Sequence, residues 1–267
     1  MTLRELFDDG GVTIGGWCAI PSAFSAELMG RFGFDWVCVD MQHGLIGYEQ
    51  AAAMLQALSI TDTPAWVRVP WNQPDYIMKA LDAGAQGIIV PMVETAAQAR
   101  SAVESVKYPP AGVRSWGPIR ASLGVEGYSP EVANKRTVVA AMIETVDGMK
   151  NMDEIMSVSG LDAIYVGPSD LGLTHGMVPT LSPEPGSAHE GLILEVLAGC
   201  QRNGVVPGVH TDSVETALRR RDAGFKMITV MSDALLLRAA ASSALAAVRG
   251  QTPAPAATTS TSGSSYA

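Results

Sequence analysis

Eight short apolar runs alternate with helix-like segments along most of the chain, and this alternation limits the folds open to it. The runs are apolar throughout, which is typical of parallel strands buried on both faces. We expect strands at 13–20, 36–41, 65–70, 87–92, 138–144, 163–167, 206–210 and 226–230. We expect helices at 22–32, 48–58, 74–83, 95–106, 147–156, 188–203, 213–223 and 232–248. Strict alternation of this kind predicts an α/β fold, a closed (β/α)8 barrel.

The length of the chain agrees with this fold. Its 267 residues suit one barrel, so residues 1–250 are expected to form a single domain. The main rival, an open doubly wound sheet, requires a glycine-rich turn after the first strand, and Ala19-Ile20-Pro21-Ser22 is not one. Residues 251–267 are mostly Thr, Ser, Ala and Pro without apolar periodicity, so we expect a disordered tail.

Charge and cysteine content narrow the choice of partners and compartment. The formal net charge of −9 disfavours nucleic acid and an anionic membrane surface, because both attract basic proteins. The three cysteines are odd in number and widely spaced, so no disulfide framework is indicated. The first ten residues are polar and charged, unlike a signal peptide, and no apolar stretch is long enough to span a bilayer. These features predict a cytoplasmic protein.

Polar residues stand at several expected strand ends, where barrel enzymes place their chemistry. Glu144 ends the fifth strand and Asp170 follows the sixth. Two carboxylates this close repel each other unless a cation lies between them, and oxygen ligands favour Mg²⁺ or Mn²⁺. The alternative is that each carboxylate caps or pairs with the helix that follows it.

Two basic residues stand in the same region. Arg68 lies between apolar neighbours, so its charge needs a partner. That partner is either a structural carboxylate such as Asp40 or an anion in the barrel mouth. His43, three residues after Asp40, is either a general base or a hydrogen-bonded structural residue, and the same alternatives hold for His210.

A third feature of the strand ends concerns anionic ligands. The amides that follow Gly167 and Pro168, those of Ser169 and Asp170, open a helix-like segment and could hold a carboxylate. The ends of the seventh and eighth strands lack the glycine-rich turns of the usual barrel phosphate site, which disfavours a phosphorylated substrate.

In combination, these motifs resemble one family. They are Phe34-Asp35-Trp36, Asp40-Met41-Gln42-His43-Gly44, Val67-Arg68-Val69-Pro70-Trp71, Ala80-Leu81-Asp82-Ala83-Gly84-Ala85-Gln86-Gly87, Val90-Pro91-Met92-Val93, Tyr108-Pro109-Pro110-Ala111-Gly112-Val113-Arg114, Ile143-Glu144-Thr145 and Gly167-Pro168-Ser169-Asp170-Leu171. The chain resembles the HpcH/HpaI aldolases, metal-dependent class II pyruvate aldolases, across residues 10–250. The resemblance implies a barrel of the phosphoenolpyruvate/pyruvate type.

The resemblance also implies roles for individual residues. Glu144 and Asp170 would hold a divalent cation, Mg²⁺, Mn²⁺ or Co²⁺. His43 would act as the base through water, with Asp40 orienting it, and Arg68 would stabilise the enolate oxygen.

Further implied roles concern the substrate and neighbouring subunits. The segment Gly167-Pro168-Ser169-Asp170 would bind the pyruvate carboxylate. Asp82 matches an acid that supports the site, across a subunit contact. Family members are usually hexamers, trimers of dimers, that exchange the last helix between paired subunits.

The activity implied is reversible cleavage of a 4-hydroxy-2-oxo acid to pyruvate or hydroxypyruvate and an aldehyde. Three alternatives stay open: a related enolate enzyme such as an oxaloacetate decarboxylase or a macrophomate-synthase-like enzyme, a CoA-ester lyase, and a barrel that only binds a keto acid. The chain departs from well-known members at Gln42, where they have Glu, and at Met142, where they have Gln. Both departures bear on substrate preference.

Overall fold

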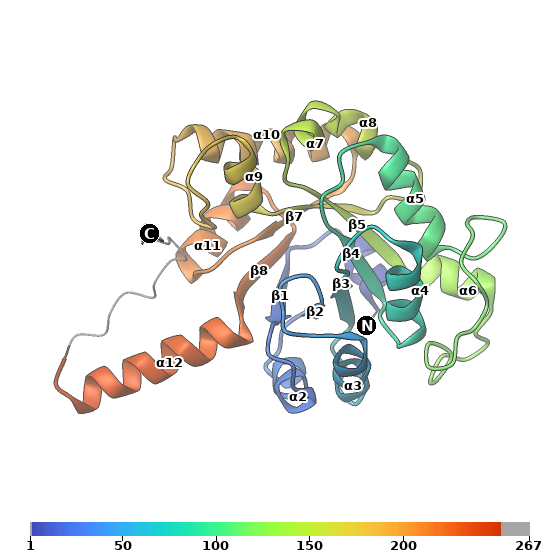
Figure 1. Ribbon diagram of the computed structural model, residues 1–267, viewed down its shortest axis with the longest axis horizontal. Helices are drawn as coiled ribbons and strands as arrows, with labels where there is room; N and C mark the ends of the chain where they lie inside the picture. The colour runs from blue at the N-terminus through green and yellow to red at the C-terminus, as the bar shows by residue number, and fades with distance from the viewer. Residues whose placement is uncertain (1, 252–267) are drawn as a thin grey trace, which may run out of the picture.

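The computed structural model describes residues 2–251, and its centre is a closed barrel of eight parallel strands (Figure 1). Each strand pairs with the next, and β8 closes the barrel on β1. The strands are β1 Thr13–Cys18, β2 Trp36–Asp40, β3 Ala65–Arg68, β4 Gly87–Val90, β5 Val138–Ile143, β6 Ala163–Val166, β7 Val206–His210 and β8 Met227–Ser232. The predicted fold class is confirmed, while the expected tail lies, apart from Gln251, outside the described residues.

Twelve helices accompany the strands of the described chain. They are α1 Leu3–Asp9, α2 Ala23–Arg31, α3 Tyr48–Leu58, α4 Pro74–Asp82, α5 Ala96–Val106, α6 Pro130–Arg136, α7 Val146–Lys150, α8 Met152–Met156, α9 Pro168–Thr174, α10 Ala188–Asn203, α11 Val214–Ala223 and α12 Asp233–Val248. The helix expected at 147–156 is in fact two, divided at Asn151.

Two short helices, α1 and α6, escape a search for apolar periodicity and are defined by their caps. A capping box of Thr2 and Glu5 begins α1, and Ser129 caps α6 ahead of Pro130. Leu3 of α1 is fully buried and belongs to the cluster of apolar residues inside the barrel. Helix α1 therefore helps to close the amino-terminal end of the barrel.

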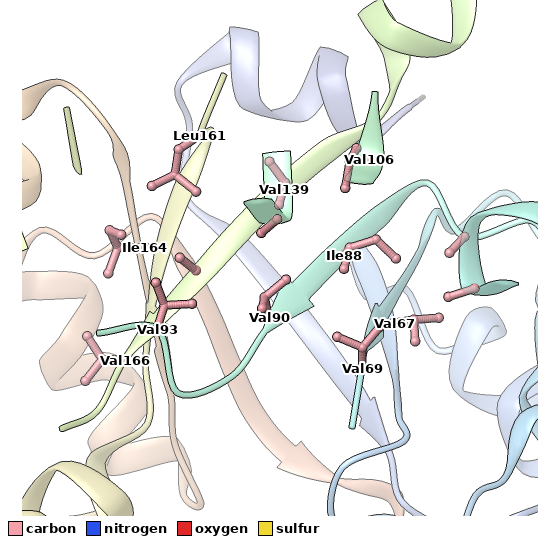
Figure 2. Packing of buried hydrophobic residues seen from close by; sticks show 14 of the residues in the cluster. Val67, Val69, Ile88, Val90, Val93, Val106, Val139, Leu161, Ile164 and Val166 are labelled. Carbon is pink, nitrogen blue, oxygen red and sulfur yellow. The ribbon is translucent and has the colours of Figure 1, made fainter. Parts of the chain in front are cut away.

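The apolar core has two parts. The larger part lies between the strands and the surrounding helices, and Figure 2 shows its valine, isoleucine and leucine side chains. The smaller part fills the barrel interior and includes Trp17, Trp36 and Trp66. Such large rings fit only where a neighbouring strand carries no side chain. A Cβ on Gly15, for example, would lie 2.1 Å from the Trp36 ring. The interior is thus a packed core, and chemistry is confined to its ends.

Helix α12 contacts the barrel mainly through its first turns, against β1 and β8. The rest of the helix extends away from the barrel (Figure 1). Leu237, Leu245 and Val248 are 63%, 55% and 89% exposed. None of the helices in the described chain is both long and apolar enough to cross a membrane.

Candidate active site

The carboxyl ends of the strands bring together side chains that are far apart in sequence. Asp40 is the last residue of β2 and Arg68 the last of β3, and the two are partners in the strand register. Glu144 directly follows β5, and Asp170 lies in the first turn of α9, just after β6. His43 follows β2 in the loop to α3. These five residues therefore share the mouth of the barrel.

Asp40 and Arg68 form a buried, two-pronged ion pair. Arg68 Nε lies 2.9 Å from Asp40 Oδ1, and Arg68 Nη2 lies 2.6 Å from Oδ2. The Trp17 indole N–H donates to the same Oδ2 at 3.1 Å. Burial by itself would raise the pKa of Asp40, but the hydrogen bonds and charge of Arg68, together with Trp17, hold it below its usual value. Of the two partners considered for Arg68, the structure thus shows the structural carboxylate.

Arg68 nevertheless keeps one unused donor. Its third nitrogen, Nη1, has no partner within the described chain and is not among the enclosed unpartnered atoms. The guanidinium also lies over the Trp17 ring, 4.9 Å from the ring centroid. Arg68 is therefore held by Asp40 and Trp17, while its Nη1 has no partner in the described chain.

Asp40 contacts His43 through the backbone. Asp40 Oδ1 accepts the amide N–H groups of Gln42, at 3.1 Å, and of His43, at 3.3 Å. The His43 ring is exposed and makes no hydrogen bond within residues 2–251. Asp40 thus fixes the loop that carries the exposed His43 ring.

Glu144 is almost completely enclosed, with 1% of its surface exposed. Its Oε1 accepts the Met92 amide at 2.9 Å, and Met92 reaches this position with a φ of 55°, in the left-handed region. A Cβ on Gly167 would lie 2.1 Å from Glu144 Oε2, so only glycine fits at that point. Burial raises the pKa of Glu144 to about 7, the Met92 amide opposes this, and the nearby Asp170 charge adds to it.

Glu144 and Asp170 fit a divalent cation. Within residues 2–251 neither is in a salt bridge, although Arg68, Arg114 and Arg220 each have a carboxylate partner. In the part of the chain that the structure describes, no three His, Cys, Asp or Glu side chains gather closely enough to hold a metal. The pair would therefore supply two ligands and leave the other positions to substrate and water, as in a catalytic site.

The beginning of α9 offers unpaired amides beside this pair. Gly167 is the N-cap and Pro168, in the first turn, has no N–H, while the Leu171 amide bonds to the Gly167 carbonyl. The amides of Ser169 and Asp170 have no acceptor inside the helix, as in any first turn. They face the carboxyl end of the barrel and can hold an anion.

Asp82 does not join the others within this chain. It ends α4, shortly before β4 begins at Gly87, and so lies at the amino end of the strands. There it accepts a hydrogen bond of 2.6 Å from Arg114 Nη2. A contribution to the site would require Asp82 of a second copy, and this role stays a prediction.

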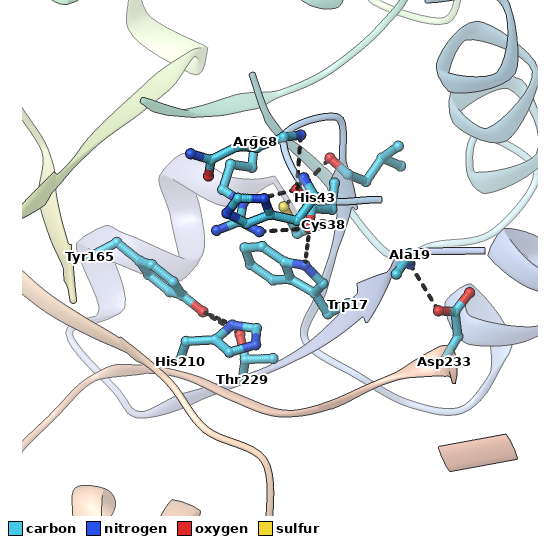
Figure 3. Close-up of polar contacts among 12 residues, drawn as sticks. Trp17, Ala19, Cys38, His43, Arg68, Tyr165, His210, Thr229 and Asp233 are labelled. Carbon is cyan, nitrogen blue, oxygen red and sulfur yellow. Dashed lines mark hydrogen bonds and ion pairs between the residues drawn. The ribbon is translucent and has the colours of Figure 1, made fainter. Parts of the chain in front are cut away.

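Sequence reasoning missed several residues of the mouth. Trp17 connects Asp40, Arg68 and His210, and it lay hidden in an apolar strand. The Met92 amide was missed because any residue can supply a backbone donor. Figure 3 shows the Trp17 indole among these groups, with Arg68 and His43 on one side and Tyr165 and His210 on the other.

Comparison with known proteins identifies the family of the chain. Residues 14–237 match the family model described as HpcH/HpaI aldolase/citrate lyase. A hydroxypyruvate/pyruvate aldolase from Rhizorhabdus wittichii is 37% identical over 248 residues, covering 92% of this chain and 98% of that protein. A 4-hydroxy-2-oxo-heptane-1,7-dioate aldolase from Escherichia coli is 35% identical over 88% of this chain and 89% of its own length.

The crystal structure of a family protein from Burkholderia cenocepacia superimposes with a TM-score of 0.86 at 30% identity, covering 92% of this chain and 98% of that one. The chain belongs to the HpcH/HpaI aldolase/citrate lyase family. It is accordingly an enzyme, a carbon–carbon lyase of the aldolase type, and such class II aldolases generally depend on a divalent metal.

The two departures from well-known family members lie close to the site. Met142 is buried, and its terminal methyl group would be 3.0 Å from a Cβ on Gly167, beside the Glu144 carboxylate. Gln42 donates its backbone N–H to Asp40 Oδ1, and its side-chain oxygen is enclosed without a partner in the described chain. Gln42 thus cannot carry a charge, and Met142 removes a polar group beside Glu144.

The raised pKa of Glu144 predicts a pH-dependent stability of the metal-free protein. Between the usual value of 4.5 and the folded value of about 7, the folded state holds a proton that the unfolded state releases. The bound proton therefore stabilises the folded state fully below pH 4.5. As the pH rises through about 7 this stabilisation is lost, and the free energy of unfolding falls by about 3 kcal/mol at most. We expect Glu144→Gln to gain stability relative to wild type between pH 5 and pH 8, measured by thermal unfolding with a chelator present. If the thermal stability of the two proteins changed with pH in the same way, the raised pKa would not belong to Glu144.

Proposed function

We propose that this protein is a divalent-metal-dependent aldolase that reversibly cleaves a 4-hydroxy-2-oxo acid to pyruvate or hydroxypyruvate and an aldehyde. The observation that carries the proposal is the enclosed Glu144 carboxylate facing Asp170 with no basic partner in the described chain, beside an arginine with a free donor. The names of the two relatives support the same substrate class, since one contains hydroxypyruvate and pyruvate and the other a 4-hydroxy-2-oxo acid.

Glu144 and Asp170 would hold Mg²⁺, Mn²⁺ or Co²⁺ in this site. The bound cation would supply Lewis acidity, which makes the protons on the carbon next to the ketone removable. The Met92 amide holds Oε1 of the Glu144 carboxylate in place. The absence of a side chain at Gly167 leaves room beside the second carboxylate oxygen, Oε2.

The substrate carboxylate would bind at the first turn of α9. The Ser169 and Asp170 amides can donate to its oxygens, and the positive end of the short helix adds to the attraction. This contact fixes the 2-oxo acid with its ketone toward Arg68.

Arg68 would stabilise the enolate oxygen through Nη1. Asp40 and Trp17 hold the other two nitrogens and the face of the guanidinium, so little reorganisation is needed when charge develops on the substrate. Asp40 is thus a positioning residue.

His43 would move the proton. Its exposed ring stands on a loop fixed by Asp40 and would reach the carbon next to the ketone, directly or through one water molecule. It removes a proton from that carbon to form the enolate and returns one to the aldehyde oxygen after the new bond has formed. Cleavage is the reverse sequence.

The direct test is an aldol assay of the purified protein. Pyruvate and hydroxypyruvate are each combined with a panel of aldehydes in the presence of Mg²⁺, Mn²⁺ or Co²⁺, and the products are identified by mass spectrometry. We expect 4-hydroxy-2-oxo acids. Consumption of oxaloacetate or a CoA ester with no aldol product would instead support one of the alternative enolate reactions. Cytoplasmic placement stays a prediction of the sequence.

We propose further that the protein assembles into a homo-oligomer, a hexamer built as a trimer of dimers, through α12. Within the described chain this helix buries only Asp233 and Ala246, and Leu236 in its first turn packs partly against the core. Further along, Leu237, Leu245 and Val248 are exposed. An exposed apolar helix of this kind is stabilised by a second surface that covers it.

We expect Leu237→Asp combined with Leu245→Asp to give a smaller assembly, because two charges would have to be desolvated at the contact. The measurement is molar mass by light scattering after size-exclusion chromatography. Ser243→Asp is the matched control, since it lies roughly 120–160° around the helix from both leucines at 100° per residue. An unchanged mass in the double variant would contradict a role of α12 in assembly.

A further inference from the structure

His210 is the last residue of β7 and lies in the barrel mouth, yet no step of the proposed reaction uses it. Its ring meets the Trp17 indole edge-on, with centroids 4.7 Å apart and the ring planes at 77°. The Arg68 guanidinium lies over the same indole. Figure 3 shows Trp17 between Arg68 on one side and His210 with Tyr165 on the other. His210 therefore lies in the same mouth as Arg68 but on a separate side of the indole.

A chain of hydrogen bonds fixes the His210 ring. Its Nδ1 lies 3.2 Å from the Tyr165 hydroxyl, and that hydroxyl also bonds to Thr229 Oγ1. Tyr165 is fully buried, and its ring packs so closely on the Gly208 backbone that a Cβ there would lie 2.7 Å from it. Strands β6 and β8 thus set the orientation of a side chain carried by β7.

The second ring nitrogen is open. Nε2 has no partner among residues 2–251, and it is not among the enclosed unpartnered atoms. His210 is mostly covered but keeps part of its surface exposed, whereas Trp17 and Tyr165 beside it are buried. Because β7 ends at His210, the residue lies at the carboxyl end of the barrel, where the mouth is. Nε2 is therefore held in a fixed place with unused hydrogen-bonding capacity.

The ring is neutral near pH 7. Burial and the Arg68 charge lower the pKa of His210 to about 3, with Asp40 opposing and His43 adding to the effect. If the Tyr165 hydroxyl donates to Nδ1, Nε2 carries the proton and donates; otherwise Nε2 accepts. A hydroxyl group on a ligand fits both cases, since it can donate and accept. A methyl group fits neither, and a carboxylate fits only the first.

The side of Trp17 on which His210 lies indicates which reactant it meets. The 2-oxo acid would be held by Glu144, Asp170 and Arg68, so the group beside His210 belongs to the second reactant. We infer that His210 is a specificity-determining residue that selects aldehydes with a hydroxyl group on the carbon next to the carbonyl. The inference rests on the aldolase function proposed above.

The test compares glycolaldehyde with propanal, which differ by a hydroxyl against a methyl group. The wild type, His210→Phe and His210→Gln are assayed with pyruvate, and kcat/KM is measured for both aldehydes. His210→Phe keeps a ring against Trp17 and removes both nitrogens, so we expect the glycolaldehyde preference to fall about tenfold, the effect of one net hydrogen bond. His210→Gln can donate and accept, so it should recover part of the preference. His175→Phe, the same change at a partly exposed histidine after α9, should leave the ratio at the wild-type value.

A second readout separates failure of this inference from failure of the aldolase function. Exchange of pyruvate methyl protons with heavy water involves no aldehyde, so it reports the first half of the reaction alone. An unchanged aldehyde ratio in a His210→Phe protein that still exchanges protons would overturn the role of His210. If His210→Phe does not fold, an unchanged ratio in His210→Leu does the same. A wild type that exchanges no protons would overturn the aldolase function, and the role of His210 with it.

Discussion

Glu144→Gln and Asp170→Asn are each expected to reduce aldol cleavage more than about a hundredfold, with the barrel still folded. Each change replaces a charged oxygen ligand by a neutral amide and lowers the affinity for a divalent cation. In the Glu144→Gln variant the new side-chain oxygen would still accept the Met92 amide, and a neutral group suits this enclosed position. Activity is followed by pyruvate release, and metal affinity by calorimetry.

A chelator should have the same effect on wild type, with activity restored by Mg²⁺, Mn²⁺ or Co²⁺. Glu195→Gln is the matched control, because Glu195 is an exposed carboxylate on α10 and the chemical change is identical. Full activity of the metal-free wild type, or of either site variant, would refute the metal-dependent mechanism.

Arg68→Ala should slow the exchange of pyruvate methyl protons by about 10²–10³, the usual effect of losing one donor to a developing oxyanion. The experiment is NMR in heavy water with metal and pyruvate but no aldehyde. His43→Ala should slow the same exchange, because it removes the base. Since pyruvate would be held by the α9 amides and the cation, its affinity should change less than the exchange rate.

The ion pair with Asp40 complicates this experiment. Arg68→Ala alone leaves a buried carboxylate without its partner, which typically costs about 3–5 kcal/mol. Arg68→Met combined with Asp40→Asn removes both charges and should fold, since paired replacement is often close to neutral. The expected result is a folded double variant with the same loss of exchange. Wild-type exchange in that protein would mean that Arg68 serves the fold alone.

The strand pattern alone was sufficient to predict the barrel. Strands buried on both faces and regularly separated by helices satisfy their backbone hydrogen bonds in few other ways, so local apolar pattern and chain order carry the information. The same reasoning placed Asp40, Arg68, Glu144 and Asp170 at one end, because parallel strands share their carboxyl ends. The helices α1 and α6 were missed, since their caps are local signals without an apolar period.

Only the tertiary structure shows which groups these side chains bind. From the sequence, the partner of Arg68 was either a ligand or Asp40. The strand register places Asp40 beside Arg68, so the two form an ion pair that leaves one guanidinium nitrogen free. The family resemblance indicated Asp82, yet the direction of α4 places it at the other end of the barrel.

Sequence by itself thus determined the fold and the end of the barrel where the chemistry is expected. The three-dimensional packing determined which groups are held, which are enclosed and which remain free. The Met92 amide on Glu144 and the Tyr165 hydroxyl on His210 join residues 52 and 45 positions apart. Such contacts depend on strand register and on the close packing of a filled barrel, and neither is encoded in any local stretch of residues.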